Sequence, residues 1–285
     1  IVFAEDDSTI HYHNNPIFEP KVEDIPEVTI NPRTQRIAIL NWTTKTSIIL
    51  EKLCSYLPTK SEISIFVTEK TSEIENQIKV NKNQYPGIDV LINGMDLNDL
   101  EQLNKINPQN FDSLLILSPG GTTIEEMDAY VISLLIRIRQ ILLSKASPSY
   151  NDNIKNKKWP KLITEVMDSE NIDIILNSGV EDFMVSNQFV SQIMAQVSEE
   201  PLTLNVYDDL FQAEGSELYI KPASFYFNFA EQKSITMCYG EFIHAAQLRN
   251  EIILGLQIHS EEQGKKNMFG IILIPNKDDE FTITE

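Results

Sequence analysis

From residue 36 onward, short continuous apolar runs alternate with segments in which apolar residues recur every three or four positions. The short runs are typical of strands buried on both faces of a parallel sheet, and the longer spacing is typical of covering helices. The clearest helical segment, 123–144, places Val131, Leu134 and Leu135 on one side. The pattern predicts an α/β fold with a Rossmann-like, doubly wound parallel sheet over residues 36–200. The predicted strands are 37–40, 63–67, 90–93, 113–117 and 161–167, and the predicted helices are 47–56, 72–78, 97–106, 123–144, 172–176 and 186–198.

Past residue 200 the pattern changes, because strand-like runs now dominate and only one short helical stretch interrupts them. This mixture predicts a small α+β lobe over residues 201–285, different in kind from the preceding sheet. The predicted strands are 217–221, 225–229, 251–258, 269–275 and 280–284, and the predicted helix is 241–248.

Residues 1–35 carry repeated prolines, at 16, 20, 26 and 32, which exclude a helix of useful length. We interpret most of this stretch as an extended linker laid over a surface. The first residues, Ile1 to Ala4, look like the end of a buried strand, so the linker is expected to follow the end of an upstream module. The chain is therefore expected to be a piece of something larger.

The chain is strongly acidic, with 23 Lys+Arg against 42 Asp+Glu and a formal net charge of -19. Clustered cations that would neutralise phosphates are scarce, which argues against binding to nucleic acid or directly to anionic lipid. Multivalent cations are a better ionic partner, although much of this charge serves solubility. Cys54 and Cys238 lie in core-like surroundings and are expected to be free buried thiols.

The turn after the first predicted strand does not match a dinucleotide site. Such a site needs Gly-x-Gly-x-x-Gly, so that the backbone can approach the pyrophosphate at a helix N-terminus. Here Asn41-Trp42-Thr43 follows the strand, with no glycine. A second turn contains Gly120-Gly121 and could cradle an anion, but Thr122 or Thr123 is better explained as the cap of the following helix.

Metal and catalytic signals are weak throughout the sequence. His11 and His13 would share one face of a strand, but a zinc site needs more ligands than this pair provides. Glu5, Asp6 and Asp7 offer oxygen ligands that suit Ca²⁺ and are the candidate metal ligands. We find no nucleophile elbow, phosphate loop or Cys-His arrangement, so the sequence favours a regulatory module over an enzyme.

A family resemblance emerges from several blocks of the chain. The blocks are Val185–Val190, Leu210–Ala223, Arg249–Gly255, Phe111–Leu117 and Val2–Asp7, and together they extend the likeness over nearly the whole chain. They closely resemble the C-terminal region of the Castor and Pollux ion channels, which are tetrameric cation channels. The resemblance implies a cytosolic RCK module (regulator of conductance of K⁺), in which a Rossmann-like lobe is joined to a smaller α+β lobe.

The same resemblance implies a role and partners. RCK modules pair and assemble into a gating ring on the cytoplasmic side of a membrane, below a pore domain that lies upstream in the same protein, and this family is associated with Ca²⁺ regulation. The segment 186–198 corresponds to the crossover helix through which RCK lobes pair. It makes Phe189, Ile193 and Met194 the interface candidates, with plain core packing as the alternative. No cofactor other than Ca²⁺ is suggested.

Two other functions compete with a channel gating ring. The chain could be a free-standing RCK-type subunit that senses a nucleotide for a K⁺ transporter, but Asn41-Trp42-Thr43 does not provide the phosphate site that this requires. It could also be a degenerate dehydrogenase, which the missing glycines and the missing catalytic residues disfavour.

Overall fold

The computed structural model of the chain describes residues 21–28, 33–120, 123–144, 160–168, 171, 183–212, 215–229, 234–258 and 270–284. The chain divides into two compact units. The larger unit is Pro32–Glu217, and the smaller unit combines Ile1–Asn31 with Leu218–Glu285. The lobe boundaries expected from the sequence, 36–200 and 201–285, stay a prediction.

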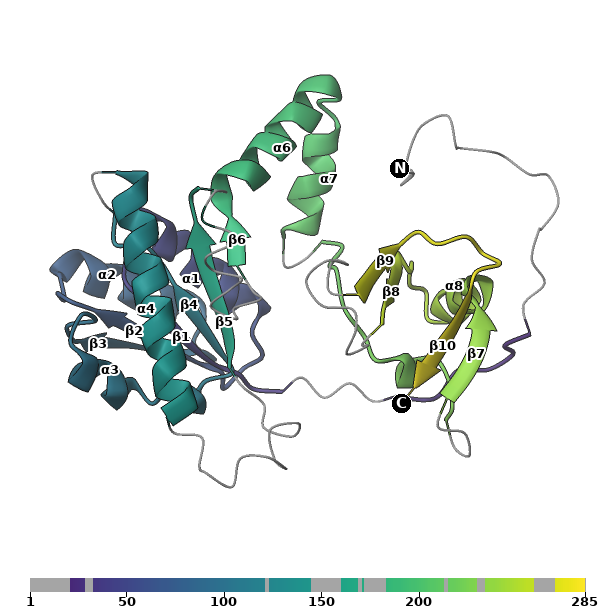
Figure 1. Ribbon diagram of the computed structural model, residues 1–285, viewed down its shortest axis with the longest axis horizontal. Helices are drawn as coiled ribbons and strands as arrows, with labels where there is room; N and C mark the ends of the chain where they lie inside the picture. Colours follow the sequence, from purple (N-terminus) through teal and green to yellow (C-terminus); the bar gives the residue numbers. More distant parts are fainter. Residues whose placement is uncertain are drawn as a thin grey trace. The chain divides into compact units, whose positions relative to one another are not determined.

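The larger unit is built on a six-stranded sheet (Figure 1). Its strands are β1 (Arg36–Leu40), β2 (Glu62–Val67), β3 (Asp89–Gly94), β4 (Ser113–Ile116), β5 (Lys161–Val166) and β6 (Phe183–Val185). Every neighbouring pair is parallel, and the strands lie in the order β3-β2-β1-β4-β5-β6. This is the doubly wound order of Rossmann folds, so the predicted fold class is confirmed.

Helices cover both faces of this sheet. On one face α1 (Thr44–Tyr56) and α2 (Ser72–Gln84) pack against the inward side chains of β1 and β2. On the other face α3 (Leu100–Ile106) and α4 (Ile124–Ser144) do the same. Consecutive residues of β1 show why the run is apolar throughout, because Ile39 packs on the first face and Leu40 on the second, both fully buried.

The helices start where short polar side chains cap them. Thr71 accepts a hydrogen bond from the Ile74 amide at the start of α2, and Asp99 accepts one from the Glu101 amide at the start of α3. At α4, Thr123 Oγ1 accepts from the Glu126 amide at 3.2 Å. Thr123, one of the two threonines that the sequence offered as the cap, therefore caps α4, and this use of the turn competes with an anion cradle.

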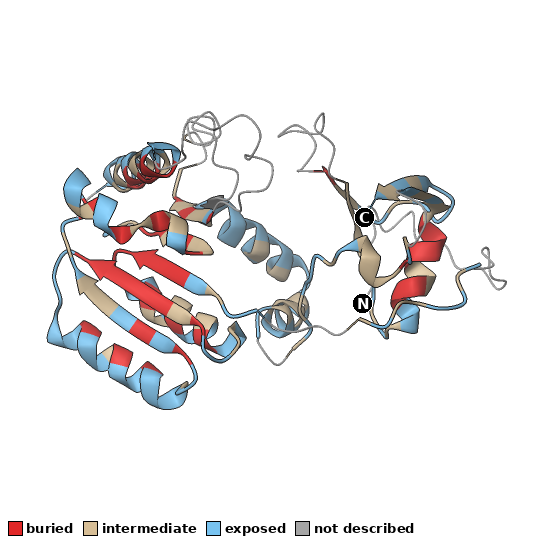
Figure 2. Cartoon of the chain, turned by 90° about the horizontal axis from the view of Figure 1, so that it is seen from below, coloured by how far each residue is buried: buried red, intermediate tan, exposed pale blue. Residues whose placement is uncertain are grey.

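The larger unit continues past the sheet into α6 (Ser186–Glu199) and α7 (Thr203–Leu210). The smaller unit contains α8 (Tyr239–Leu248), the 3-10 helix η5 (Ala223–Phe225), and two antiparallel strand pairs. The first pair joins β7 (Ser234–Cys238) to β10 (Glu280–Thr284), and the second joins β8 (Gly255–Gln257) to β9 (Ile271–Leu273). Its core is an aromatic cluster in which Phe227 and Phe242 meet edge to face, 5.0 Å apart. Buried positions gather in the large sheet and in α8 (Figure 2).

Some predicted elements were wrong, and some elements of the structure were not predicted. Segment 217–221 is not a strand, because its backbone pairs with no other strand, and η5 occupies the start of the predicted strand 225–229. The predicted strands 251–258 and 269–275 shrink to β8 and β9. The elements β6, α7 and β7 were not predicted, and the predicted helix 172–176 lies outside the described residues. Within the described ranges, no helix has both the length and the apolar character needed to cross a bilayer.

Candidate functional site

The carboxyl edge of the sheet between β1 and β4 is the place where a doubly wound fold binds ligands, because the strand order reverses there. In this chain the Asn41 side chain occupies that place. Asn41 is 4% exposed and has a φ of 79°. Its Nδ2 donates to the Leu117 carbonyl at 2.7 Å, and its Oδ1 accepts from the Tyr130 hydroxyl at 3.4 Å. The asparagine therefore ties β1 to the end of β4 across the position of a nucleotide phosphate.

The first turn of α1 is closed by its own threonines. Thr46 Oγ1 accepts from the Thr43 amide at 2.7 Å, and Thr43 Oγ1 accepts from the Lys45 amide at 3.2 Å. The Thr46 amide bonds to the Thr43 carbonyl at 3.0 Å. A phosphate at this helix end would have to displace these contacts, because it would need the same amide groups.

An ion pair crosses the same edge. Lys45 on α1 pairs with Glu165 on β5, and the glutamate side chain is 17% exposed. Since Lys45 already faces a carboxylate, the positive charge at the start of α1 is compensated within the unit. This edge of the sheet is thus held by the Asn41 side-chain amide, the capping threonines of α1 and the Lys45–Glu165 ion pair. All three make their contacts within the larger unit.

Asp128 is a second organising group, 1% exposed on α4. Its Oδ1 accepts from the Met167 amide at 2.9 Å, and its Oδ2 accepts from the Asp168 amide at 2.9 Å. The Asn171 side chain donates to Oδ2 at 2.8 Å. A buried carboxylate with this many donors is fully paired, so Asp128 fixes the chain where it leaves β5.

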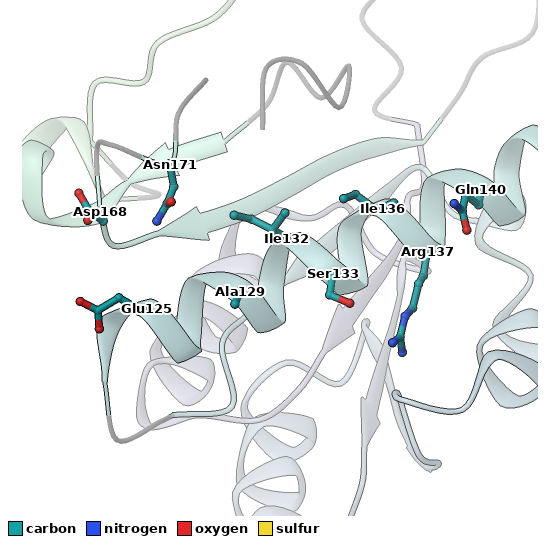
Figure 3. Close-up of a pocket in the computed structure, with 9 residues that line it drawn as sticks. All are labelled: Glu125, Ala129, Ile132, Ser133, Ile136, Arg137, Gln140, Asp168 and Asn171. Atoms are coloured by element: carbon teal, nitrogen blue, oxygen red, sulfur yellow. The ribbon is translucent and has the colours of Figure 1, made fainter. Parts of the chain in front are cut away.

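A groove of about 800 Å³ runs along the outer face of α4. Figure 3 shows Glu125 at one end, near Asp168 and Asn171, and Gln140 at the other end. Arg137 belongs to the second end and donates to the Asn98 carbonyl at 2.9 Å. The groove thus combines an acidic end, an apolar middle and a basic end, without a group that identifies a ligand. Its lining residues are Glu125, Ala129, Ile132, Ser133, Ile136, Arg137, Gln140, Asp168 and Asn171.

The helices α6 and α7 form a pair (Figure 1) in which no residue is buried. No residue of α6 is buried, although its apolar positions follow the spacing of an amphipathic helix. The two helices contact each other through aromatic rings, with Phe189 and Phe211 at 6.3 Å and Tyr207 stacked on Phe211 at 6.2 Å. The Tyr56 hydroxyl anchors the pair to α1 by donating to the Phe211 carbonyl at 2.9 Å. The exposed apolar residues of the pair are Phe189, Val190, Met194, Leu202, Leu204 and Phe211, which we call the α6–α7 surface.

The interface candidates from the sequence lie together on this helix. Phe189 is 42% exposed and Met194 is 64% exposed, while Ile193 has intermediate exposure. Among the described residues, packing leaves Phe189 and Met194 exposed and Ile193 partly exposed. Their role in assembly stays a prediction. Sequence reasoning missed Leu204 and Phe211, although Leu204, Tyr207 and Phe211 are spaced as on one helix face.

The metal candidates Glu5, Asp6 and Asp7 lie outside the described residues, as do His11 and His13. In the part of the chain that is described, no group of three or more His, Cys, Asp or Glu side chains is placed to hold a metal ion.

A polar network in the smaller unit is centred on Glu251. Lys221 donates to Glu251 Oε1 at 2.7 Å, and the Tyr226 hydroxyl donates to Oε2. Burial raises the pKa of Glu251, but the hydrogen bonds from Lys221 and Tyr226 outweigh it and lower the pKa overall. Burial and the bond to the carboxylate raise the pKa of Tyr226. The network ties residue 221, at the start of this unit, to the end of α8.

Comparison with known proteins adds a family context. No family model matches the chain. Among curated proteins, the chain is 24% identical to the probable ion channel SYM8 of Pisum sativum over 94% of its own length. It is 24% identical to the ion channel CASTOR and 25% identical to the ion channel POLLUX, both of Lotus japonicus, over 94% and 92% of its length. The chain is similar to the Castor and Pollux ion channels.

The resemblance to Castor and Pollux channels seen in the sequence is thereby confirmed. The likeness spans nearly the whole chain but only 32% of SYM8, 33% of CASTOR and 30% of POLLUX. The chain therefore corresponds to about a third of such a channel.

Solved structures give weaker matches. A short-chain dehydrogenase/reductase from Serratia marcescens matches with a TM-score of 0.32 and 16% identity, over 47% of this chain and 56% of that one. Lactate dehydrogenase from Eimeria maxima matches with a TM-score of 0.33 and 12% identity, over 54% and 43%. The Rossmann-like assignment of this chain rests on its own strand order.

Proposed function

We propose that this chain is a regulatory region of a cation channel, the second RCK module of a gating ring on the cytoplasmic side of the membrane. The observation that carries the proposal is the similarity to named ion channels, 24–25% over 92–94% of the chain. The pore domain would belong to the part of those channels that this chain does not span. In this proposal the chain is not an enzyme, and its role in K⁺ or other cation transport is to move the pore.

Assembly of the ring would use the α6–α7 surface. An amphipathic helix that buries none of its residues exposes apolar area that a partner could cover. We infer that Phe189, Ile193 and Met194 face the same residues of a second module, since a two-fold interface brings the same patch together from both copies. Pairs formed in this way would build the tetrameric ring of the channel.

Ligand binding would act on the pore through the ring. A ligand shifts a ring between two states only by the difference in its affinity for them. Ca²⁺ is the ligand we propose, with Glu5, Asp6 and Asp7 as the candidate oxygen ligands.

A nucleotide-sensing subunit of a K⁺ transporter is the alternative function. It would need an anion site at the start of α1, where Asn41 and the paired threonines Thr43 and Thr46 already use the available groups. Calorimetric titration with ATP, ADP and NADH separates the two proposals. Micromolar binding of any of them would replace the channel proposal by the alternative.

The oligomeric state tests the gating-ring proposal directly. We expect light scattering to show concentration-dependent dimers or tetramers of the wild-type chain, and monomers after Met194→Glu, which places a charge within the α6–α7 surface. Val80→Glu is the matched control, because Val80 is 63% exposed on α2, away from this surface, and should leave assembly unchanged. A wild-type chain that stays monomeric at all concentrations, with no thermal shift in millimolar Ca²⁺, would contradict the proposal.

A further inference from the structure

The turn between β1 and α1 has the spacing of a dinucleotide fingerprint, with polar residues in place of the glycines. The fingerprint Gly-x-Gly-x-x-Gly begins directly after the first strand of a doubly wound sheet and leads into the next helix. β1 ends at Leu40 and α1 begins at Thr44, so the three glycine positions fall on Asn41, Thr43 and Thr46. The side chains at all three positions make the contacts that close the turn.

Asn41 has the backbone conformation of the first glycine. That glycine makes the tight turn, and the φ of Asn41, 79°, lies in the left-handed region that glycine enters most easily. The Asn41 amide still donates to the Phe66 carbonyl of β2 at 2.9 Å, so the sheet is regular up to this residue. The side chain, in a residue that is 4% exposed, then crosses to the Leu117 carbonyl at the end of β4. The turn is thus shaped for a glycine but filled by an amide.

Thr43 and Thr46 act as the acceptors that a phosphate would otherwise provide. A phosphate at a helix N-terminus accepts hydrogen bonds from the amides of the first turn. Here Thr46 Oγ1 accepts from the Thr43 amide at 2.7 Å, and Thr43 Oγ1 accepts from the Lys45 amide at 3.2 Å. Thr46 is 0% exposed, which agrees with the third glycine position, where the helix packs closely on the strand. Amides that a pyrophosphate would use are therefore bonded within the turn.

We propose that Asn41, Thr43 and Thr46 are an internal substitute for the pyrophosphate of a dinucleotide and keep this edge of the sheet closed to nucleotides. The closure is then a property of three side chains, and the backbone and strand order beneath them are those of a nucleotide site. These residues therefore determine specificity by exclusion. This inference holds whether or not the chain belongs to a channel.

Glu69 indicates which nucleotide the three side chains exclude. In dinucleotide sites an acidic residue about 20 positions after the glycines binds the ribose hydroxyls of NAD, whereas an arginine accommodates the extra phosphate of NADP. Glu69 is exposed and lies just past the end of β2, at this position. Glycine at positions 41 and 43 would therefore open a site for NADH.

Amide hydrogen exchange, followed by NMR, measures the internal contacts in the whole chain. Thr46→Val keeps the shape of the buried side chain but removes its hydroxyl. We expect the Thr43 amide to exchange at least tenfold faster in this variant, because its acceptor is lost. Thr44→Val is the matched control, since it removes a hydroxyl from an exposed position of the same turn and should leave the rate unchanged. Equal rates at Thr43 in the wild type and in Thr46→Val would overturn the proposal.

Calorimetric titration with NADH and with inorganic pyrophosphate measures what the side chains exclude. We expect Asn41→Gly/Thr43→Gly to bind NADH at least tenfold more tightly than the wild type does. Both glycines suit their positions, because Asn41 already has a positive φ and glycine is tolerated as a helix cap. Thr71→Gly, which removes the cap of α2 in the same way, should leave the affinity for NADH unchanged.

Each outcome of the titration has a definite meaning. Pyrophosphate bound as tightly as NADH would support the substitution of a phosphate and overturn the role of Glu69. No gain for either ligand, in a double variant that keeps a cooperative urea transition, would overturn the proposal and leave the channel function untouched. Micromolar binding of NADH by the wild type would overturn both. If the double variant does not fold, the exchange rate in Thr46→Val decides the question alone.

Discussion

Replacing Asp128 with asparagine tests whether one buried carboxylate sets the path of the chain after β5. The carboxylate is 1% exposed and accepts the Met167 amide on one oxygen and the Asp168 amide and Asn171 side chain on the other. Asparagine keeps one oxygen and turns an NH₂ group toward a donor. At least one hydrogen bond is therefore lost and one N–H is left buried without an acceptor.

The expected cost follows from these contacts. Hydrogen bonds to a charged group are worth about 1.5–3 kcal/mol each, and an unsatisfied buried donor costs about 1–3 kcal/mol. Because the asparagine oxygen retains part of the network, we expect Asp128→Asn to lower the free energy of unfolding of the larger unit by about 2–4 kcal/mol. Asp128→Ala removes every acceptor and should cost more, about 3–5 kcal/mol.

Tryptophan fluorescence in urea provides the assay, because it isolates the unit that contains Asp128. Both tryptophans of the chain, at 42 and 159, fall within Pro32–Glu217. The urea concentration at the midpoint of unfolding should fall in Asp128→Asn. The slope of the unfolding free energy against urea concentration should stay the same, since the unit remains folded before the transition. Glu125→Gln, one turn earlier on α4 and exposed, removes the same charge and should change the stability by less than about 0.5 kcal/mol. If Asp128→Asn lowers the free energy of unfolding no more than Glu125→Gln does, Asp128 does not set the path of the chain after β5.

Three further predictions concern other parts of the chain. The pKa of Glu251 is lowered in the folded chain, so the unfolded state binds more protons in acid, and the contribution of this network to stability is lost as the pH falls through the folded pKa. Urea unfolding should show less loss of stability between pH 7 and acid pH in Glu251→Gln than in the wild type. A Cβ on Gly215 would lie 2.1 Å from the Asp209 carbonyl, so Gly215→Ala should lower the melting temperature of the chain by several degrees in a thermal scan. Burial raises the pKa of the Cys54 thiol to about 11, so a thiol reagent at neutral pH should modify the half-buried Cys238 first and Cys54 only on unfolding.

The central strands β1 and β2 were predictable because they are buried on both sides. A run such as Ile37–Leu40 has no polar side to place in water, so it must lie between two layers of helices. The length and one-sided spacing of α4 were predictable for the same kind of reason, since its buried side faces the sheet. β6 was missed because it has only three residues, too few to show a period.

The smaller unit was harder to predict because apolar residues there do not imply burial. Leu218, Tyr219 and Ile220 suggested a strand, yet they are 67%, 67% and 76% exposed. Their backbone pairs with no other strand, since the chain at this point passes from one unit to the other. The docking of residues 21–28 could not be predicted either, because Glu241 gives no local sign that it will bind amides 220 positions away.

The exposed apolar side chains on α6 and α7 also limit how strong a pairing of this chain can be. A stable interface buries about 800 Å² on each partner, and one large aromatic side chain supplies at most about 150–250 Å² of it. Phe189 and Phe211 are only 42% and 48% exposed, because part of each ring already packs against the other ring. Each Å² of apolar surface buried in a pairing contributes about 25 cal/mol. The exposed area that remains must first offset the lost translational and rotational freedom of the two chains, which costs at least about 4 kcal/mol. The α6–α7 surface alone therefore suits the centre of a larger interface, and the isolated chain should pair weakly and reversibly.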